Sequence, residues 1–192
     1  VGRIIETLRS VRKQKKIFLF LIAFFFFIDG VYTIIDMATA YGSALGLDST
    51  GLLLALLVTQ FVAFPFSILF GRLAEKYDTG KLILTCIAAY TGITVFAVFM
   101  KAQWQFWVLA IFVGMFQGGI QALSRSYFAK IVPPERSGEY FGLMDICGKG
   151  ASFMGTTVVG LASQAFGSIN IGVSAIVFLF IAGALFFMKT EH

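Results

Sequence analysis

The sequence predicts an all-α integral membrane protein built as a bundle of six transmembrane helices, and three observations support this. Apolar residues make up 58% of the 192-residue chain and charged residues 13%, whereas soluble domains have about 45–50% and about 25%. The apolar residues gather in six stretches near the roughly 20 residues that a helix needs to cross a bilayer. Lysine and arginine lie between these stretches, almost all on one side. A chain this apolar cannot hide its hydrophobic surface in one water-soluble core.

The six predicted spans follow one another with short connections. In chain order they cover residues 17–41, 51–70, 82–100, 106–124, 140–165 and 169–188. Pro65 lies within the second span, where a proline is expected to kink a helix. No connection is long enough to form a separate soluble domain. We therefore predict two parts, a basic cytoplasmic segment over residues 1–16 and a six-helix transmembrane domain over residues 17–192.

Charge distribution predicts the orientation. Thirteen of the fifteen lysines and arginines fall in the N-terminal segment, in the connections after the second and fourth spans, or after the last span. The exceptions are Lys101, on the opposite side, and Lys149, inside the fifth span. The positive-inside rule then places both termini in the cytoplasm, in a multi-pass protein of the plasma (inner) membrane. No folded basic face is predicted, so nucleic acid is not an expected partner.

The N-terminal segment allows two interpretations. Its apolar residues Val1, Ile4, Ile5, Leu8 and Val11 fall near one helical face, with basic residues elsewhere. This is typical of a helix lying on the anionic inner leaflet, and a solvated arm is an equal alternative.

The spans also divide into two triplets. The first two members of each triplet carry polar groups within the membrane, whereas the third and sixth spans are almost purely apolar. Polar groups face protein or water, so we expect the third and sixth spans to face lipid. Three-plus-three inverted repeats of this kind form one half of a major facilitator transporter.

Two aspartates lie in the first span. Asp29 is roughly 18 Å deep at 1.5 Å per residue, where a charged side chain costs at least about 2.5–3.5 kcal/mol. A buried aspartate can be neutralised by protonation, so Asp29 is a candidate proton carrier, with an interhelical hydrogen bond as the alternative role. Asp36 shares its face but lies near the outer end of the span, where a structural role is favoured.

The fifth span contains an acid and a base, Asp145 and Lys149. Their i, i+4 spacing permits an ion pair on one helix. Either they neutralise each other, or Lys149 also reaches Asp29 across the bundle. Gly148 and Gly155 on the same helix permit a neighbouring helix to approach closely.

The fourth span carries amides on one face. Gln117 and Gln121 are four residues apart, and amides, which both donate and accept, suit a polar or zwitterionic solute. Packing between helices is the alternative role. Gly114 and Gly118 form a GxxxG motif for close helix packing. Gln60 in the second span is expected to face the same cavity.

The segment GRLAEKYDTGK, from Gly71 to Lys81, resembles the major facilitator signature Gly-x-Leu-Ala-Asp-Arg-x-Gly-Arg-Arg/Lys. That signature lies between helices two and three and often recurs between eight and nine. Glu75 replaces its aspartate, Lys76 its arginine, and Asp78 stands where a glycine is expected. The resemblance implies a cytoplasmic gate in which the acid engages a helix N-terminus and an arginine, a sound electrostatic pairing. The implied gating residues are Gly71, Arg72, Leu73, Glu75 and Lys76, with Arg125.

A longer stretch narrows the resemblance. QGGIQALSRSYFAK (residues 117–130) and PPERSGEYFG (133–142), with IDGV (28–31) in the first span, are similar to the vacuole-effluxer-like branch of that superfamily. The resemblance implies that the chain is the C-terminal half, helices seven to twelve. It also implies that residues 1–16 end a central cytoplasmic loop. The implied function is efflux or exchange of small solutes, with amino acids as the best-known class in eukaryotic relatives.

The leading hypothesis is therefore a secondary active transporter that moves a small polar solute by alternating access, with proton coupling as a further expectation. One bundle supplies half a cavity, so the expected partner is the missing N-terminal six-helix half or a second copy. The alternatives are an intramembrane aspartyl protease using Asp29 and Asp145, and a channel or structural bundle. The sequence contexts of presenilin-like enzymes are missing, and His192 is the only histidine. We expect no enzyme activity, cofactor or metal, and Cys86 and Cys147 to be unpaired.

Overall fold

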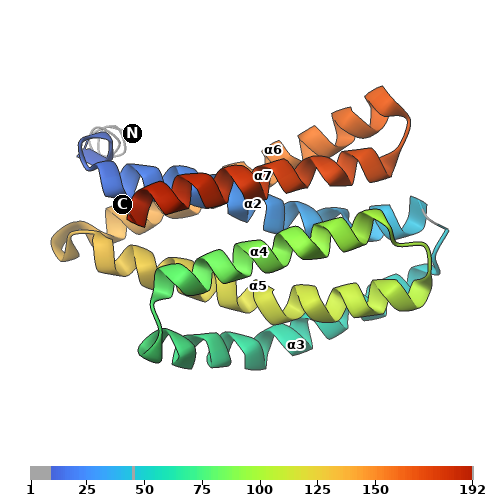
Figure 1. Cartoon of the computed structure of the whole chain (residues 1–192), viewed down its shortest axis with the longest axis horizontal. Helices are drawn as coiled ribbons and strands as arrows, with labels where there is room; N and C mark the ends of the chain where they lie inside the picture. Colours follow the sequence, from blue (N-terminus) through green and yellow to red (C-terminus); the bar gives the residue numbers. More distant parts are fainter. Residues whose placement is uncertain (1–9, 45, 192) are drawn as a thin grey trace.

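The computed structural model describes residues 10–44 and 46–191, and within these ranges it contains helices and no strand. Six long helices run back and forth along one axis (Figure 1). They are α2 Lys15–Ala44, α3 Ser49–Lys76, α4 Thr79–Val98, α5 Gln103–Ile131, α6 Ser137–Phe166 and α7 Ile169–Glu191. A 3-10 turn, Pro134–Arg136, leads into α6. The predicted all-α bundle is confirmed, and each predicted span lies within one long helix or overlaps most of it.

Five of these six helices are both long enough and apolar enough to cross a membrane. The sixth, α6, has 30 residues and therefore the length. It does not reach the apolar composition by itself, because Asp145, Lys149 and several small polar residues lie in its sequence. It nevertheless packs lengthwise on α2 and α7. The fifth predicted span is thus an amphipathic member of the bundle.

The segment that resembles the gating signature is more helical than predicted. We expected a loop over residues 71–81, but α3 continues to Lys76 and α4 begins at Thr79. Only Tyr77 and Asp78 connect the two helices. The Asp78 side chain accepts a hydrogen bond from the backbone N–H of Lys81 at 2.9 Å, and this N-cap allows α4 to start immediately.

The packing of the helices is nearly symmetric between the two triplets. Helix α2 of the first triplet (α2, α3 and α4) packs on α6 and α7 of the second. In the same way, α5 of the second triplet (α5, α6 and α7) packs on α3 and α4 of the first. Exchanging the triplets therefore maps one set of contacts onto the other, and the α2–α5 and α4–α7 contacts map onto themselves. One pair breaks the pattern: α6 packs on α7, whereas α3 and α4 share few contacts. This is the arrangement expected of two inverted repeats of three helices.

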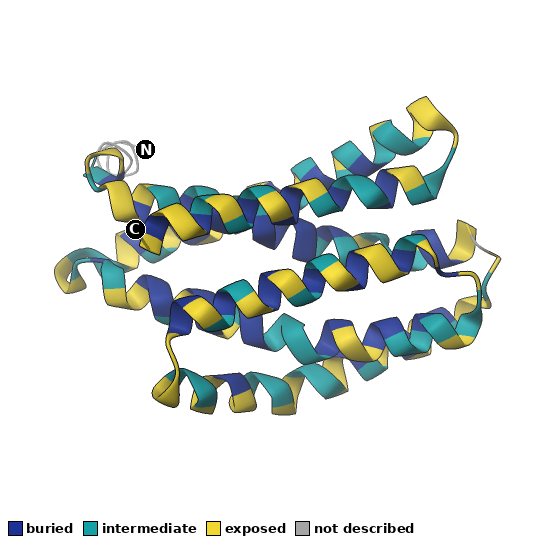
Figure 2. Ribbon diagram, in the orientation of Figure 1, coloured by how far each residue is buried: buried dark blue, intermediate teal, exposed yellow. Residues whose placement is uncertain are grey.

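Each long helix carries both buried and exposed residues along its length (Figure 2), and many of the exposed side chains are large and apolar. Away from their ends, α4 and α7 expose apolar side chains, which fits the prediction that these two helices face lipid. Helix α3 is exposed most: 17% of its most apolar window is buried, against 67% for α2. Lipid or another protein must cover this face of α3, because contact between water and so many phenylalanine and leucine side chains is unfavourable. Its exposed large side chains are Leu53, Leu54, Leu57, Phe61, Phe64, Ile68 and Leu69.

Candidate translocation face

Asp29 is completely buried where α2 meets α6. Its Oδ1 accepts a hydrogen bond from the backbone N–H of Gly155 at 2.8 Å and a longer one from the Thr33 hydroxyl at 3.5 Å. Its Oδ2 is buried and has no hydrogen-bond partner among the described residues. A carboxyl group that is half satisfied in an apolar bundle is costly. Such groups in membrane helices are commonly functional.

Gly155 permits the close approach of the two helices that the sequence predicted at this position, and the hydrogen bond to Asp29 depends on it. A side-chain carbon at position 155 would lie 2.5 Å from Asp29 Oδ1 and would collide with the Thr33 hydroxyl. The backbone of α6 therefore approaches α2 closely enough to donate directly to the carboxylate. Gly148 was also predicted to permit close approach, but it has more room. A side-chain carbon at position 148 would have the Phe24 ring as its nearest neighbour, at 3.6 Å.

Asp36 marks a second contact between the same two helices. The hydroxyl of Ser152 donates to Asp36 Oδ2 at 2.6 Å, in an exposed position. The exposed carboxylate fits the structural role that the sequence favoured for it. The α2–α6 interface therefore holds two aspartates, one dry and one accessible.

Asp145 is paired differently from either sequence-based alternative. Its Oδ1 lies 2.8 Å from Arg125 Nη2, so the ion pair joins α6 to α5. The predicted Asp145–Lys149 pair is absent from the described contacts, as is a Lys149–Asp29 pair. Lys149 is instead exposed. The i, i+4 spacing made the first pair geometrically permissible, but Asp145 is turned toward the longer and more reachable guanidinium of the neighbouring helix.

The amides of α5 lie on the same side as Arg125, because Gln117, Gln121 and Arg125 recur every fourth residue. Gln117 and Gln121 are half-buried, and Gln117 Oε1 is buried without a hydrogen-bond partner among the described residues. Gln60 is exposed on α3 and borders a small cavity of about 20 Å³ that α2 and α5 also line. Neither Gln117 nor Gln121 lines this cavity, so a site shared by the three glutamines stays a prediction.

Tyr32 connects the charged groups of three helices. Its side chain on α2 lies within electrostatic reach of Arg125, Asp145 and Asp36. Residues of α2, α5 and α6 therefore converge on one face of the bundle, which we call the polar face. Its members are Tyr32, Asp36, Gln117, Gln121, Arg125, Asp145, Lys149 and Ser152.

Asp29 and Asp145 do not form the acid pair that a protease would need. Asp29 is bonded to Gly155 and Thr33 in the interior, and Asp145 to Arg125 at the surface. The two carboxylates thus have separate partners in separate environments, and the protease alternative is not supported.

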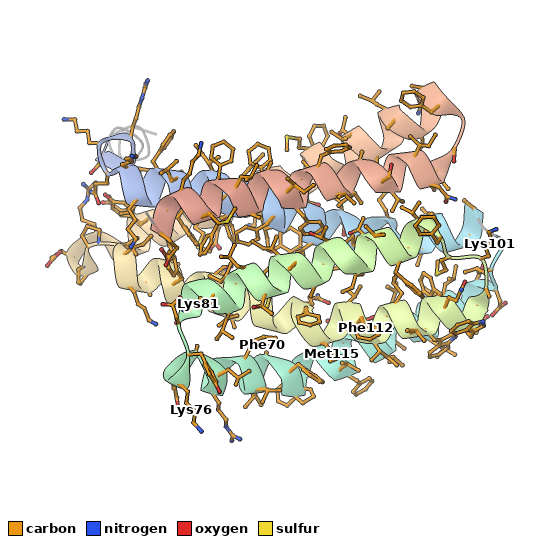
Figure 3. All side chains as sticks on the ribbon, in the orientation of Figure 1. Phe70, Lys76, Lys81, Lys101, Phe112 and Met115 are labelled. Atoms are coloured by element: carbon orange, nitrogen blue, oxygen red, sulfur yellow. The ribbon has the colours of Figure 1, made fainter. Side chains whose placement is uncertain are left out.

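The residues that resemble a gate lie together at one end of the bundle. Gly71, Arg72, Glu75 and Lys76 are exposed on the last turns of α3, and Leu73 is half-buried. Figure 3 shows Lys76 pointing away from the bundle, opposite Lys81 at the start of α4. Within the described residues, Glu75 does not contact a helix N-terminus or Arg125. The gating role of these residues therefore stays a prediction.

Sequence reasoning missed a polar cluster at this same end. The Tyr127 hydroxyl donates to the Glu191 carboxylate, and the Glu191 carboxylate lies against Gly80 in the first turn of α4. Lys130 donates to the Thr79 hydroxyl at 2.8 Å, and Lys16 lies over the Tyr127 ring. A carboxylate beside a helix N-terminus is favourable. No local spacing predicts this cluster, because its members come from four helices.

An all-α bundle of apolar helices, with charged and amide side chains gathered on one face, is the architecture of a membrane transporter of the major facilitator type. The sequence profile described as "Vacuole effluxer Atg22 like" matches residues 1–191. The chain belongs to this family.

Three relatives illustrate its range. The chain is 46% identical over 181 residues to the uncharacterized MFS-type transporter YxiO of Bacillus subtilis, which covers 94% of the chain and 42% of YxiO. It is 29% identical to autophagy-related protein 22 of Saccharomyces cerevisiae, over 83% of the chain and 32% of that protein. The protein of the same name from Cryptococcus neoformans is 26% identical, over 90% of the chain and 34% of the relative. The chain thus spans 32–42% of the length of these relatives.

Proposed function

We propose that this chain is the C-terminal half of a secondary active transporter, corresponding to helices seven to twelve, and that it moves a small polar solute by alternating access. The observation that carries the proposal is the polar face. Charged, amide and hydroxyl side chains of α2, α5 and α6 converge there, while the exposed middle regions of α4 and α7 are apolar. Substrate sites of such transporters lie at the midplane between two bundles. The polar face is therefore the half-cavity that binds solute.

The chemistry of the polar face favours a zwitterionic solute such as an amino acid. Arg125 and Lys149 supply positive charge, and Asp36 and Asp145 supply negative charge. Gln117 offers a buried carbonyl oxygen that has no hydrogen-bond partner among the described residues. A solute with both an ammonium and a carboxylate group complements such a mixed surface. Efflux is the kind of transport that the family description names.

The half-cavity needs a second wall. We propose that an N-terminal six-helix half supplies it, with a second copy of the chain as the alternative. The exposed apolar face of α3 supports either partner, since part of it would be covered on closure. The excess of lysine and arginine at the end where α2 begins supports cytoplasmic termini, and the plasma membrane is the proposed location.

Asp29 is the proposed proton carrier. It is buried, and its Oδ1 accepts a hydrogen bond from the backbone of α6. Its Oδ2 has no hydrogen-bond partner within the part of the chain that the structure describes. Protonation would weaken the bond that Gly155 donates, because a neutral carboxyl is a poorer acceptor than a carboxylate. The α2–α6 contact would then loosen when Asp29 is protonated and tighten when Asp29 loses the proton. Proton binding would in this way be linked to a helix movement.

The test uses a two-bundle transporter that contains this chain, reconstituted in vesicles. Amino acids are screened by counterflow, and uptake is then measured with and without an imposed pH gradient. Asp29→Asn is expected to abolish the response to the gradient while counterflow persists. The matched control is Asp36→Asn, which removes an accessible carboxylate from the same helix. Asp36 belongs to the polar face, so this variant is expected to weaken solute binding, but the transport that remains should keep its response to the gradient. If Asp29→Asn leaves both transport and coupling intact, the role proposed for Asp29 is wrong.

The need for a second wall has its own test. Cysteine pairs placed on the polar face of the isolated 192-residue chain are crosslinked in bilayers. Dimers joined through that face are expected if a second copy can stand in for the missing half. If only monomers form, the second-copy alternative is excluded.

A further inference from the structure

A groove between α4 and α5 lies apart from the polar face. It has a volume of about 410 Å³ and is lined by apolar residues only, so it falls within the roughly 300–1,000 Å³ typical of small-molecule sites. Ile93 and Leu109 form its floor, since both are buried, and Phe96 and Phe112 rise on either side. Its remaining lining residues are Ala89, Gly92, Val108 and Phe116.

Gly92 makes the groove open. A side-chain carbon at this position would meet no atom within 4 Å, so the glycine does not serve close helix packing as Gly114 does. Gly92 therefore leaves the space beside it unfilled. A groove kept open within two membrane-spanning helices faces hydrocarbon and must be filled by something apolar.

The depth of the groove matches one leaflet of a bilayer. Trp104 lies at the start of α5 and is 64% exposed, which is typical of tryptophans at the membrane–water interface. From Trp104 to Phe116 the helix rises roughly 18 Å at 1.5 Å per residue. That distance is close to the ~15 Å of hydrocarbon in one leaflet, half of the bilayer core. The groove thus runs along the region where a lipid acyl chain lies.

A single positive charge lies in the connection between the two helices that line the groove. Lys101 lies in the connection between α4 and α5, is exposed, and its ammonium has no partner among the described residues. Figure 3 shows Lys101 at the end of the bundle, with Phe112 further along α5. It is also the one lysine or arginine that the charge distribution leaves on that side of the protein. Asp48, an acid at the same end, is engaged as the N-cap of α3.

We propose that this groove binds one acyl chain of an anionic phospholipid, whose phosphate is held by Lys101, in the leaflet opposite the termini. The apolar walls accommodate the chain, the open space above Gly92 gives it room, and the ammonium at headgroup level complements the phosphate. The bound lipid fills the space that α4 and α5 leave between them. This site is independent of the solute site, because the two share no residue.

The two tryptophans of the chain, Trp104 and Trp107, provide the probe, because both lie on α5, one of the two helices that line the groove. Trp104 is four residues before Val108 and therefore shares the helix face of that lining residue. The full 192-residue chain is reconstituted in phosphatidylcholine vesicles that contain an increasing fraction of phosphatidylglycerol with brominated acyl chains. Bromine quenches tryptophan fluorescence on contact. Brominated phosphatidylglycerol is expected to quench at about fivefold lower mole fraction than brominated phosphatidylcholine, the factor that one lysine near an anionic surface contributes. Equal quenching by the two lipids would mean an ordinary lipid annulus and would overturn the proposal.

Two variants with matched controls separate the groove from the charge. Gly92→Leu fills the groove and should reduce quenching by both lipids, whereas Gly160→Leu, at an equally open position on α6, should not. Lys101→Gln should remove the preference for the anionic lipid, whereas Lys81→Gln, at the other end of α4, should preserve it.

If the tryptophan fluorescence of Gly92→Leu is quenched as strongly as that of the unchanged chain, the groove is not the site. Should that variant fail to fold, Lys101→Gln decides alone, since it lies outside the helices. Quenching that falls as the protein concentration rises would assign the groove to a second copy and would also overturn the proposal.

Discussion

The α2–α6 and α3–α5 interfaces each join a helix of one triplet to a helix of the other, and they are equivalent when the two triplets are exchanged. The two interfaces are nevertheless held together by different means. Between α3 and α5, the GxxxG glycines bring the helices into backbone contact: side-chain carbons at Gly114 and Gly118 would lie 2.6 and 2.7 Å from the carbonyl oxygens of Thr59 and Ala63. Between α2 and α6, the close approach at Gly155 serves a carboxylate instead. One interface is packed backbone against backbone, and the other surrounds a titratable group.

The difference indicates a division of labour. A contact between two backbones has no side chain that can change state, so the α3–α5 pair is suited to move as one body. The α2–α6 contact depends on the charge and rotamer of Asp29, and its strength can change with protonation. If the proposed transport mechanism holds, movement within this half is expected at α2–α6 rather than at α3–α5.

The largest expected effect is that of Gly114→Ala. Its new methyl group would meet the Thr59 carbonyl oxygen at 2.6 Å, and a backbone atom can move away only if the helices separate. Overpacking of this kind costs about 1–3 kcal/mol. The loss is measured as a lower thermal unfolding midpoint in detergent micelles. Gly92→Ala is the control, since that position is open, and equal midpoints for the two variants would contradict backbone packing at α3–α5.

A smaller loss is expected for Gly155→Ala, about 1 kcal/mol, the lower end of the overpacking range. The added methyl group meets the Thr33 hydroxyl and Asp29 Oδ1, which are side-chain atoms that can rotate. Removing the hydroxyl should therefore relieve the collision, so Thr33→Ala combined with Gly155→Ala should recover part of the stability. The same unfolding measurement applies. If the double variant loses as much stability as the two single variants together, or more, this account is wrong.

Thr59→Val tests the hydrogen bond that accompanies the backbone contact of α3 and α5. The Thr59 hydroxyl donates to Ala110 O on the neighbouring helix at 3.2 Å and to Ala55 O on its own at 3.0 Å. Interhelical bonds in membranes average about 0.6 kcal/mol, and we expect a destabilisation of that size. Thr91→Val is the control, because Thr91 donates within its own helix, to Ile87 O. A larger loss at Thr91 would show that the interhelical bond contributes nothing.

The smallest effect is expected from the Arg125–Asp145 ion pair. Its side chains are 58% and 49% exposed, and exposed pairs contribute about 0.2–1 kcal/mol. A double-mutant cycle with Arg125→Gln and Asp145→Asn should give a coupling energy within this range, and added salt should reduce it. Denaturation of the four proteins at two salt concentrations measures both. A coupling well above 1 kcal/mol and insensitive to salt would mean that the polar face is dry.

Much of the bundle could be predicted from sequence because membrane helices are specified locally. A run of about 20 apolar residues is a sufficient signal, and the GxxxG spacing of Gly114 and Gly118 correctly indicated a packing surface. The helix ends were less predictable: α3 and α5 continue past their apolar runs to Lys76 and Ile131. Charged residues do not interrupt helical hydrogen bonding, so the edge of an apolar run marks the membrane rather than the end of the helix.

The sequence by itself determined that the chain is an all-α membrane bundle, which residues are polar inside it, and where glycines permit close approach. Only the tertiary structure decided which partners these groups have. Asp145 was near Lys149 by spacing but pairs with Arg125, and Asp29 is bonded to the backbone of α6. Spacing along one helix limits which side chains share a face, but the rotation of that helix is set by the side chains of its neighbours. The partners of a polar group therefore follow from the packing of the whole bundle.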